Sequence, residues 1–334
     1  MAVFTPINKK GISLLLSQYH IGDVVTINGI ASGIENSNFY LNTTTGQYVL
    51  TIFERLTATE LPFYLQFTQH LSEQNLPVAT IHPCRDRSLF TSMLGKPSVI
   101  AKRLKGHSIT TANVDHCRAL GSTLARMHLA AESFSQNKMN SRSLYWWQKV
   151  ITTIVQNLKI DHTLASIEKK KLIKLIRDEL SIQTDFFSSQ EYANLPGHVC
   201  HCDLFRDNVF FEEIPNQLPT ISGVFDFYFA GYDKRLFDLA VCVNDWCSQD
   251  NGHINLDLSK ALCQAYSKIC PVNAVENNVW SFMLRAAAFR FLMSRLYDYY
   301  LPRPATQLIA HDPKRFQFIL QNHIDSNRSA HLFF

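Results

Sequence analysis

Alternation of apolar and polar residues in the first hundred positions predicts a small sheet. Residues 24–31 (VVTINGIA) alternate, 37–43 (SNFYLNT) follow, and the turn TTTG leads into 47–53 (QYVLTIF). A period of two is typical of strands, and a turn signal between two such runs predicts a hairpin. A second hairpin at 88–104 brings the expected sheet to five strands, and one helix is expected over 59–75.

From residue 113 onward the pattern changes to that of helices. Val114, Cys117, Leu120 and Leu124 recur at spacings of three and four, which places them on one helix face. Similar patterns predict further helices, and two stretches between them are expected as short strands or strand-like loops. The helices are expected at about 143–158, 163–187, 236–247, 256–270, 275–299 and 312–323, and the strand-like stretches at 198–211 and 221–228.

These patterns predict an α+β protein with two lobes. Residues 1–104 form the expected small β-rich lobe, and residues 105–334 the larger, mainly helical lobe. With 46% hydrophobic and 18% charged residues, the chain is too apolar for a disordered protein. A cleft between two lobes is a natural place for a small-molecule ligand.

Charge and hydropathy narrow the classes of partner. The net charge of +4 comes from scattered residues, and the densest basic run, EKKKLIK at 168–174, follows a helical pattern in which lysines face water. We therefore expect no nucleic-acid partner. The longest apolar segment is interrupted by Arg285 and Arg290, so no membrane span is expected. No secretory signal is evident, and the eight cysteines lack disulfide-like spacing, which favours free thiols in the cytoplasm.

The stretch HVCHCDLFRDN at 198–208 combines histidines and cysteines as a metal site does. On a strand, His198, Cys200 and Cys202 share one face, with neighbours roughly 6.6 Å apart along the strand. Tetrahedral zinc needs its donor atoms within about 2.3 Å of one point, and its ligands come in curled spacings such as CxxC. The pattern therefore disfavours zinc, and the sulfurs are expected in the core.

The residues that follow indicate phosphoryl transfer. Asp203 and Asn208 are separated by four residues, and Asp226 lies in a later FDF. This is the order of a kinase catalytic loop and its metal-binding aspartate. Asp203 is predicted to accept the proton of an attacking hydroxyl, and Asn208 and Asp226 to supply oxygen ligands to Mg²⁺. His201 is expected to anchor the loop. Asp and Asn are common in turns, so the spacing gains weight only from the whole combination.

HCDLFRDNVFF and FDFYFAGYDKRLFDLAVCVNDW resemble the aminoglycoside phosphotransferase-like kinases of small molecules, which have a bilobal, protein-kinase-like fold. In that family an aspartate at the start of a helix orders the loop, and Asp238 of DLA matches it. GIENSNFYL, YVLTIFER and RLYD resemble the bacterial homoserine kinase branch. This resemblance implies transfer of the γ-phosphoryl group of ATP to the side-chain hydroxyl of L-homoserine, with Mg²⁺, as a step of threonine biosynthesis.

The same resemblance implies where the nucleotide is held. The stretch 32–38 would cover the phosphates, and backbone groups of the connector around residues 101–104 would hold the adenine. The position that usually carries a strand lysine is Thr51, so the phosphate cation stays open among Arg55, Lys102 and Lys105. The predicted nucleotide-binding residues are Ser32, Gly33, Asn36, Asn38, Thr51, Lys102 and Leu104.

Homoserine carries a carboxylate and an ammonium, so its pocket is expected to supply an arginine or a set of N–H donors, together with an acidic or carbonyl group. Arg206, Trp246 and Trp147 are the predicted substrate-binding residues, although core packing is the favoured role for the tryptophans. Two other functions compete with the leading one. One is a kinase for another small alcohol, such as choline or an aminoglycoside. The other is a nucleotide-binding pseudokinase, supported only by the missing strand lysine. The sequence predicts no oligomeric state.

Overall fold

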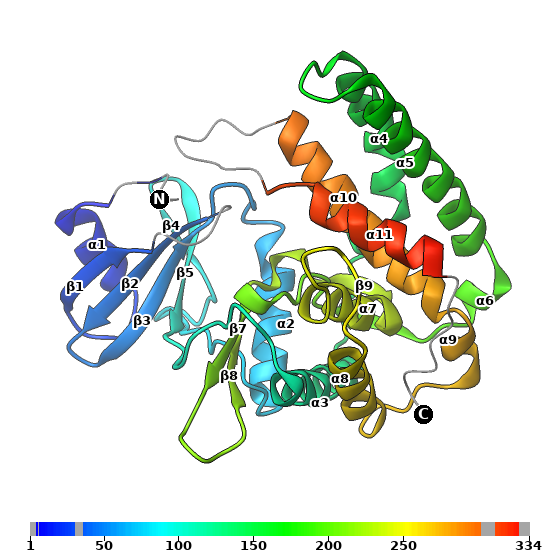
Figure 1. Cartoon of the computed structure of the whole chain (residues 1–334). Coiled ribbons are helices and arrows are strands. Elements are labelled where there is room, and N and C mark those ends of the chain that lie inside the picture. The colour runs from blue at the N-terminus through cyan, green and yellow to red at the C-terminus, as the bar shows by residue number, and fades with distance from the viewer. Residues whose placement is uncertain (1–4, 6, 31–35, 302–310, 327–334) are drawn as a thin grey trace. The chain divides into compact units, whose positions relative to one another are not determined.

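The computed structural model describes residues 5, 7–30, 36–301 and 311–326 (Figure 1). The chain forms two compact units. The first contains the residues up to His107 together with Ser222–Phe225, and the second contains Ser108–Ile221 and the described residues from Asp226 onward. The expected lobe boundary at residue 104 stays a prediction; the structure adds that a later segment of the chain belongs to the first unit.

The first unit is built on a five-stranded antiparallel sheet, as the alternation predicted. Its strands follow the order β1-β2-β3-β5-β4. Consecutive strands pair except where β5 lies between β3 and β4. The strands are β1 (Val24–Gly29), β2 (Ser37–Thr43), β3 (Gly46–Ile52), β4 (Thr91–Met93) and β5 (Lys96–Lys102).

The two faces of this sheet differ in burial. In β2 every second residue is buried, and these residues, such as Phe39 and Leu41, pack with helix α1 (Lys9–Leu16) in one apolar core. The alternate residues are half-buried. Helix α1 was not predicted from the sequence; it begins at the cap residue Asn8, whose side chain accepts a hydrogen bond from Gly11 N. Helix α2 (Leu61–Glu73) lies within the predicted range.

The second unit is mainly helical. The single helix expected over 275–299 is two helices, because Val279 ends α9 and directly precedes α10. Its helices are α3 (Val114–Ala131), α4 (Leu144–Ile160), α5 (Ser166–Phe187), α6 (Gln190–Ala193), α7 (Arg235–Trp246), α8 (Leu256–Ser267), α9 (Ala274–Asn278), α10 (Trp280–Tyr300) and α11 (Lys314–Ser326). Within the described residues, none of these helices is long and apolar enough to cross a membrane.

Two helix contacts organise the second unit. Helix α3 lies against α8 at Gly121, where an added Cβ would meet the Leu262 carbonyl oxygen at 2.2 Å. Only glycine allows this approach. Helix α10 packs against α4, α5, α7 and α11, and most of its residues from Ala286 to Met293 are buried (Figure 1). The unit thus has one long helix at its centre.

Short strands and 3₁₀ turns connect these helices around the candidate site. β6 (Gly197–Cys200) pairs antiparallel with β9 (Gly231–Lys234), a strand that the sequence patterns missed. The two stretches expected as strand-like contain more than one element each. They hold β7 (Val209–Glu212), β8 (Thr220–Val224) and the 3₁₀ turns η1 (Arg206–Asn208) and η2 (Phe227–Phe229).

Candidate active site

The loop after β6 presents Asp203. Cys202, just before it, has a left-handed backbone with φ of 64°, which costs a residue with a side chain roughly 1 kcal/mol. The Asp203 amide donates to Nδ1 of His201 at 3.3 Å. Asn208 closes the loop, because its Nδ2 donates to the Asp203 carbonyl oxygen at 2.9 Å. The loop is therefore held at both ends around Asp203, whose side chain is 17% exposed.

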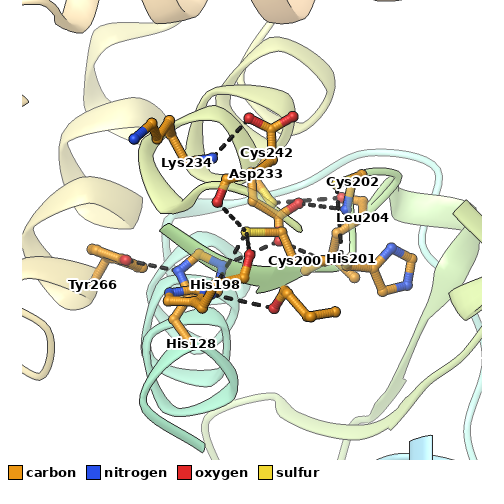
Figure 2. Close-up of polar contacts among 12 residues, drawn as sticks. His128, His198, Cys200, His201, Cys202, Leu204, Asp233, Lys234, Cys242 and Tyr266 are labelled. Carbon is orange, nitrogen blue, oxygen red and sulfur yellow. Dashed lines mark hydrogen bonds and ion pairs between the residues drawn. The ribbon is translucent and has the colours of Figure 1, made fainter. Parts of the chain in front are cut away.

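Asp238, in the first turn of α7, fixes the start of this loop. Its carboxylate accepts the backbone N–H groups of His201 at 2.9 Å and Cys202 at 2.8 Å. The same carboxylate is hydrogen-bonded to Nε2 of His128 at 3.1 Å, and the Nδ1 atom of His128 lies 2.7 Å from the Tyr266 hydroxyl. Figure 2 shows this buried network around the loop. These contacts are the ones that a loop-ordering role of Asp238 requires.

Burial and hydrogen bonds shift the pKa values of the groups in this network. Burial would raise the pKa of Asp238, but the hydrogen bond and charge of His128 and the backbone donors outweigh it and lower the pKa. Burial lowers the pKa of His198 to about 3, with His128 adding to the effect. Burial also raises the pKa of the Cys200 and Cys202 thiols well above the ordinary value. One buried carboxylate therefore serves as the acceptor for several surrounding donors.

His128, Cys200 and Asp238 bring potential metal-ligating atoms within 4.8 Å of one another. Each of the three is already engaged: both ring nitrogens of His128 and both oxygens of Asp238 have hydrogen-bond partners. The Cys200 sulfur contacts the carbonyl oxygens of His198 and Asp233 (Figure 2). A raised thiol pKa also disfavours the thiolate that a metal needs. We interpret this group as a hydrogen-bonded core.

Asp226 follows β8 with a second left-handed backbone, φ 63° and ψ 54°. Such a conformation in a non-glycine residue occurs disproportionately at functional sites. The next residue, Phe227, packs its ring against His201, with centroids 4.6 Å apart. Asn208 uses its Nδ2 within the loop, so its Oδ1 is the atom suited to a cation. Amide and carboxylate oxygens are the ligands that Mg²⁺ takes, so the donor set of Asn208 and Asp226 fits this ion.

A cation on α10 also contacts the loop. Nη1 of Arg290 lies 3.4 Å from Oδ1 of Asp203, and Arg290 is almost fully buried. This pair was missed from the sequence. Its signal was the series Arg285, Arg290 and Arg295 inside an apolar helix, from which the partner of each arginine was not predictable. Arg285 instead pairs with Glu179 on α5.

Arg206 is held beside the loop by polar contacts. Its backbone N–H donates to Asp245 Oδ2 at 2.9 Å, and its Nη1 donates to the Thr110 carbonyl oxygen at 2.7 Å. Asp245 is also paired with Arg315 at 3.0 Å. The side chain of Arg206 remains partly exposed, at 23%. It is therefore a fixed cation three positions after Asp203.

Trp246 and Trp147 are buried in the core. Nε1 of Trp246 donates to the Leu204 carbonyl oxygen at 3.0 Å, which ties α7 to the catalytic loop. Nε1 of Trp147 donates to the Arg142 carbonyl oxygen at 2.7 Å, and its ring packs edge-on against Phe289. Both tryptophans therefore make the core-packing contacts that the sequence analysis gave as the alternative to substrate binding.

In the first unit, Asn38 and Thr51 lie together on the half-buried face of the sheet. They are direct partners in the register of β2 and β3, and Thr51 Oγ1 donates to Asn38 Oδ1 at 2.8 Å. Asn36 lies just before β2 and Lys102 ends β5. Leu104 packs against Gly223. Ser32 and Gly33 fall outside the described residues.

A lysine on β5 joins an ion pair at the other face of this sheet. Lys96 pairs with Glu54, which also accepts hydrogen bonds from Ser37 and Thr5. Thr51 is opposite Val99 in the register, whereas Lys96 alternates with the buried Ser98. Lys96 therefore projects from the face opposite Thr51. It does not replace the strand lysine, and the choice among Arg55, Lys102 and Lys105 stays open.

Comparison with known proteins defines the class. The sequence model of the phosphotransferase enzyme family (APH) matches residues 26–272. An amicoumacin kinase in complex with AMP-PNP and Ca²⁺ superimposes with a TM-score of 0.69 at 13% identity, over 98% of this chain and 96% of that chain. A spectinomycin phosphotransferase in complex with ADP and spectinomycin gives 0.67 at 12% identity, over 95% of both chains. The chain belongs to this phosphotransferase family and has its bilobal kinase fold.

Relatives of higher sequence identity show to which branch of the phosphotransferase family the chain belongs. A homoserine kinase of Burkholderia multivorans is 47% identical over 97% of this chain and 96% of the relative. One of Paraburkholderia phytofirmans is 45% identical over the same shares. Within the phosphotransferase family, the chain therefore belongs with the homoserine kinases. The family predicted from the loop and sheet motifs is confirmed, and so is the prediction of a kinase enzyme.

Proposed function

We propose that this protein transfers the γ-phosphoryl group of MgATP to the side-chain hydroxyl of L-homoserine, giving O-phospho-L-homoserine and ADP in threonine biosynthesis. The assignment of L-homoserine as the substrate rests on the identity of 45–47% to homoserine kinases over 97% of the chain. The catalytic loop supports the reaction class, because Asp203 and Asn208 are hydrogen-bonded into one rigid turn.

Asp203 is the proposed base. The hydroxyl oxygen of homoserine forms a bond to the γ-phosphorus, the bond from phosphorus to the ADP oxygen breaks, and the hydroxyl proton passes to the Asp203 carboxylate. Asn208 and Asp226 hold Mg²⁺, which neutralises phosphate charge when it is bound. His201 and Asp238 keep the loop in register through the backbone contacts described above.

The substrate and nucleotide are assigned to further residues. Arg206 binds the carboxylate of homoserine, because Asp245 and Thr110 hold its guanidinium beside the loop. Asn38 and Thr51 line the nucleotide side of the sheet, with Lys102 and Leu104 at the strand end that holds the adenine. The remaining proposed nucleotide-binding residues are Ser32, Gly33 and Asn36.

Two variants test the residue roles. Asp203→Asn should bind MgATP as the wild type does and lower kcat by about 10²-fold or more, because proton acceptance and positioning are lost together. Asp226→Ala should weaken Mg²⁺-dependent nucleotide binding, measured by calorimetry with MgATP and with ATP in EDTA. Unchanged turnover in the first variant would remove Asp203 as the base, and equal MgATP affinity in the second would remove Asp226 as a ligand.

A further inference from the structure

A buried guanidinium lies beside the proposed base. Arg290 is 3% exposed, and its Nη1 atom lies 3.4 Å from Oδ1 of Asp203. Its Cζ atom lies 3.7 Å from the ring centroid of Phe291 and 5.3 Å from that of Phe229. Cation and carboxylate therefore meet at one edge of the catalytic loop, with the cation between two aromatic rings.

A contribution to stability alone does not explain this buried ion pair. Burying a guanidinium is costly, and a buried ion pair can often be replaced by apolar residues without loss of stability. Burial lowers the pKa of Arg290 to about 10, although the charge of Asp203 counters the effect. Arg290 thus stays protonated at neutral pH. Within the described residues, its Nε atom has no hydrogen-bond partner, so the site is not optimised for the arginine itself.

We propose that Arg290 is a positioning residue for Asp203: its buried guanidinium, 3.4 Å from the carboxylate, orients that carboxylate toward the acceptor hydroxyl. This inference rests on the proposed role of Asp203 as the base. Arg290 takes no proton in the reaction. The hydroxyl proton still passes to Asp203, while the bond to phosphorus forms and the bond to ADP breaks.

Orientation matters more than basicity in this type of reaction. Transition states of phosphoryl transfer are loose, so the enzyme acts mainly through positioning and electrostatic stabilisation. A fixed carboxylate can direct the hydroxyl oxygen at the phosphorus, whereas a rotated one cannot. A displacement of about 1 Å at such a site can lower the rate by about 10²-fold.

Other charges act near the same pair. Arg142 and Arg295 add positive potential at Arg290. Arg295 is influenced in turn by Asp203, Asp298, Asp207 and Asp245. These groups all remain when Arg290 alone is changed, so a loss of turnover in such a variant reports the loss of this one cation.

The same helix offers a matched control. Arg285, five residues earlier on α10, forms a buried ion pair with Glu179, with Nε 3.2 Å from both carboxylate oxygens. Five residues of helix turn the side chain by about 140°, so the two arginines leave α10 in different directions. Removing either arginine takes the cation away from a carboxylate, but only Arg290 contacts the catalytic loop.

The test compares Arg290→Met, Arg290→Lys and Arg285→Met by steady-state kinetics and by thermal unfolding. Arg290→Met should lower kcat by about 10²-fold, with KM for MgATP within about threefold of the wild type. Arg290→Lys should lower kcat by only about tenfold, because it keeps the charge but lacks the planar guanidinium.

Arg285→Met should lower the unfolding temperature while leaving kcat per folded molecule as in the wild type. If kcat stays within threefold in both Arg290 variants, or if Arg285→Met lowers kcat per folded molecule equally, the positioning role is rejected. If Arg290→Met does not fold, the reduced kcat of Arg290→Lys decides alone: a wild-type value rejects the inference.

Failure of the proposed function gives a different result. An inactive wild type, or full activity in Asp203→Asn, would contradict the reaction or the base before Arg290 is considered. The inference also predicts that Arg290→Met lowers kcat by less than threefold in an Asp203→Asn background, because there is no longer a carboxylate to position. A full additive loss in the double variant would contradict it.

Discussion

Asp238→Asn is the sharpest test of how the fold holds the catalytic loop. The carboxylate of Asp238 is fully buried and accepts three donors, namely the N–H groups of His201 and Cys202 and the ring of His128. Asparagine has the same size but only one acceptor oxygen. Its NH₂ group must therefore face one of these donors, and the remaining hydrogen bonds lose their charge.

The magnitude follows from these contacts. One buried N–H without an acceptor costs about 1–3 kcal/mol, and two hydrogen bonds that change from charged to neutral lose about 1 kcal/mol each. Removing the cost of burying a charge offsets part of this loss. We expect the free energy of unfolding to fall by about 2–4 kcal/mol. The left-handed Cys202 is held by this carboxylate, so Asp203 should also lose its position, with kcat lower by about 10²-fold.

Urea unfolding and steady-state kinetics measure both effects. Asp257→Asn is the control, because Asp257 lies exposed in the first turn of α8 and its replacement should change stability by less than about 0.5 kcal/mol. An Asp238→Asn variant with wild-type stability and wild-type kcat would refute the idea that the Asp238 carboxylate orders the loop.

Three further predictions follow from single contacts. Cys202→Val should lower the free energy of unfolding by about 2 kcal/mol or more, because a branched side chain is strained at φ 64°, whereas Cys202→Gly should relieve backbone strain; urea unfolding compares the two. Trp246→Phe should cost about 1 kcal/mol in the same assay through the lost bond to the Leu204 carbonyl oxygen; equal stability would contradict it. Burial would raise the pKa of Glu54, but hydrogen bonds from Lys96, Ser37 and Thr5 lower it below 4.5. Glu54 therefore adds stability above pH 4.5 that is lost as pH falls through the lower, folded-state pKa, and Glu54→Gln should lack that part of the acid-side decline in thermal scans.

Much of the fold was predictable because local patterns determine it. Alternation gave the sheet, and spacings of three and four gave most helices. Helix α1 was missed because KKGISLLL has only one turn with a clear apolar face, and its burial depends on the sheet that it covers. The split between α9 and α10 was missed because Val275, Val279 and Met283 continue a helical spacing of four across the break.

For the site, the residues of the catalytic loop were predictable from the sequence, but their partners from other helices were not. The spacing of Asp203, Asn208 and Asp226 is a local property of the chain, so the sequence displayed it. The partners of the loop come from distant helices: His128 from α3 and Arg290 from α10. No spacing along one chain encodes such contacts, because they depend on how helices pack. The phosphate cation stays unassigned for the same reason.

The acceptor assay tests the central claim most directly. ADP release from MgATP would be measured with L-homoserine, L-serine, choline and an aminoglycoside, and the phosphorylated product identified by mass spectrometry. We predict strong turnover with L-homoserine alone and a product heavier by one phosphoryl group. Preferential turnover of another alcohol would contradict homoserine as the substrate while keeping the kinase, and MgATP binding without turnover of any acceptor would contradict the proposed catalysis itself.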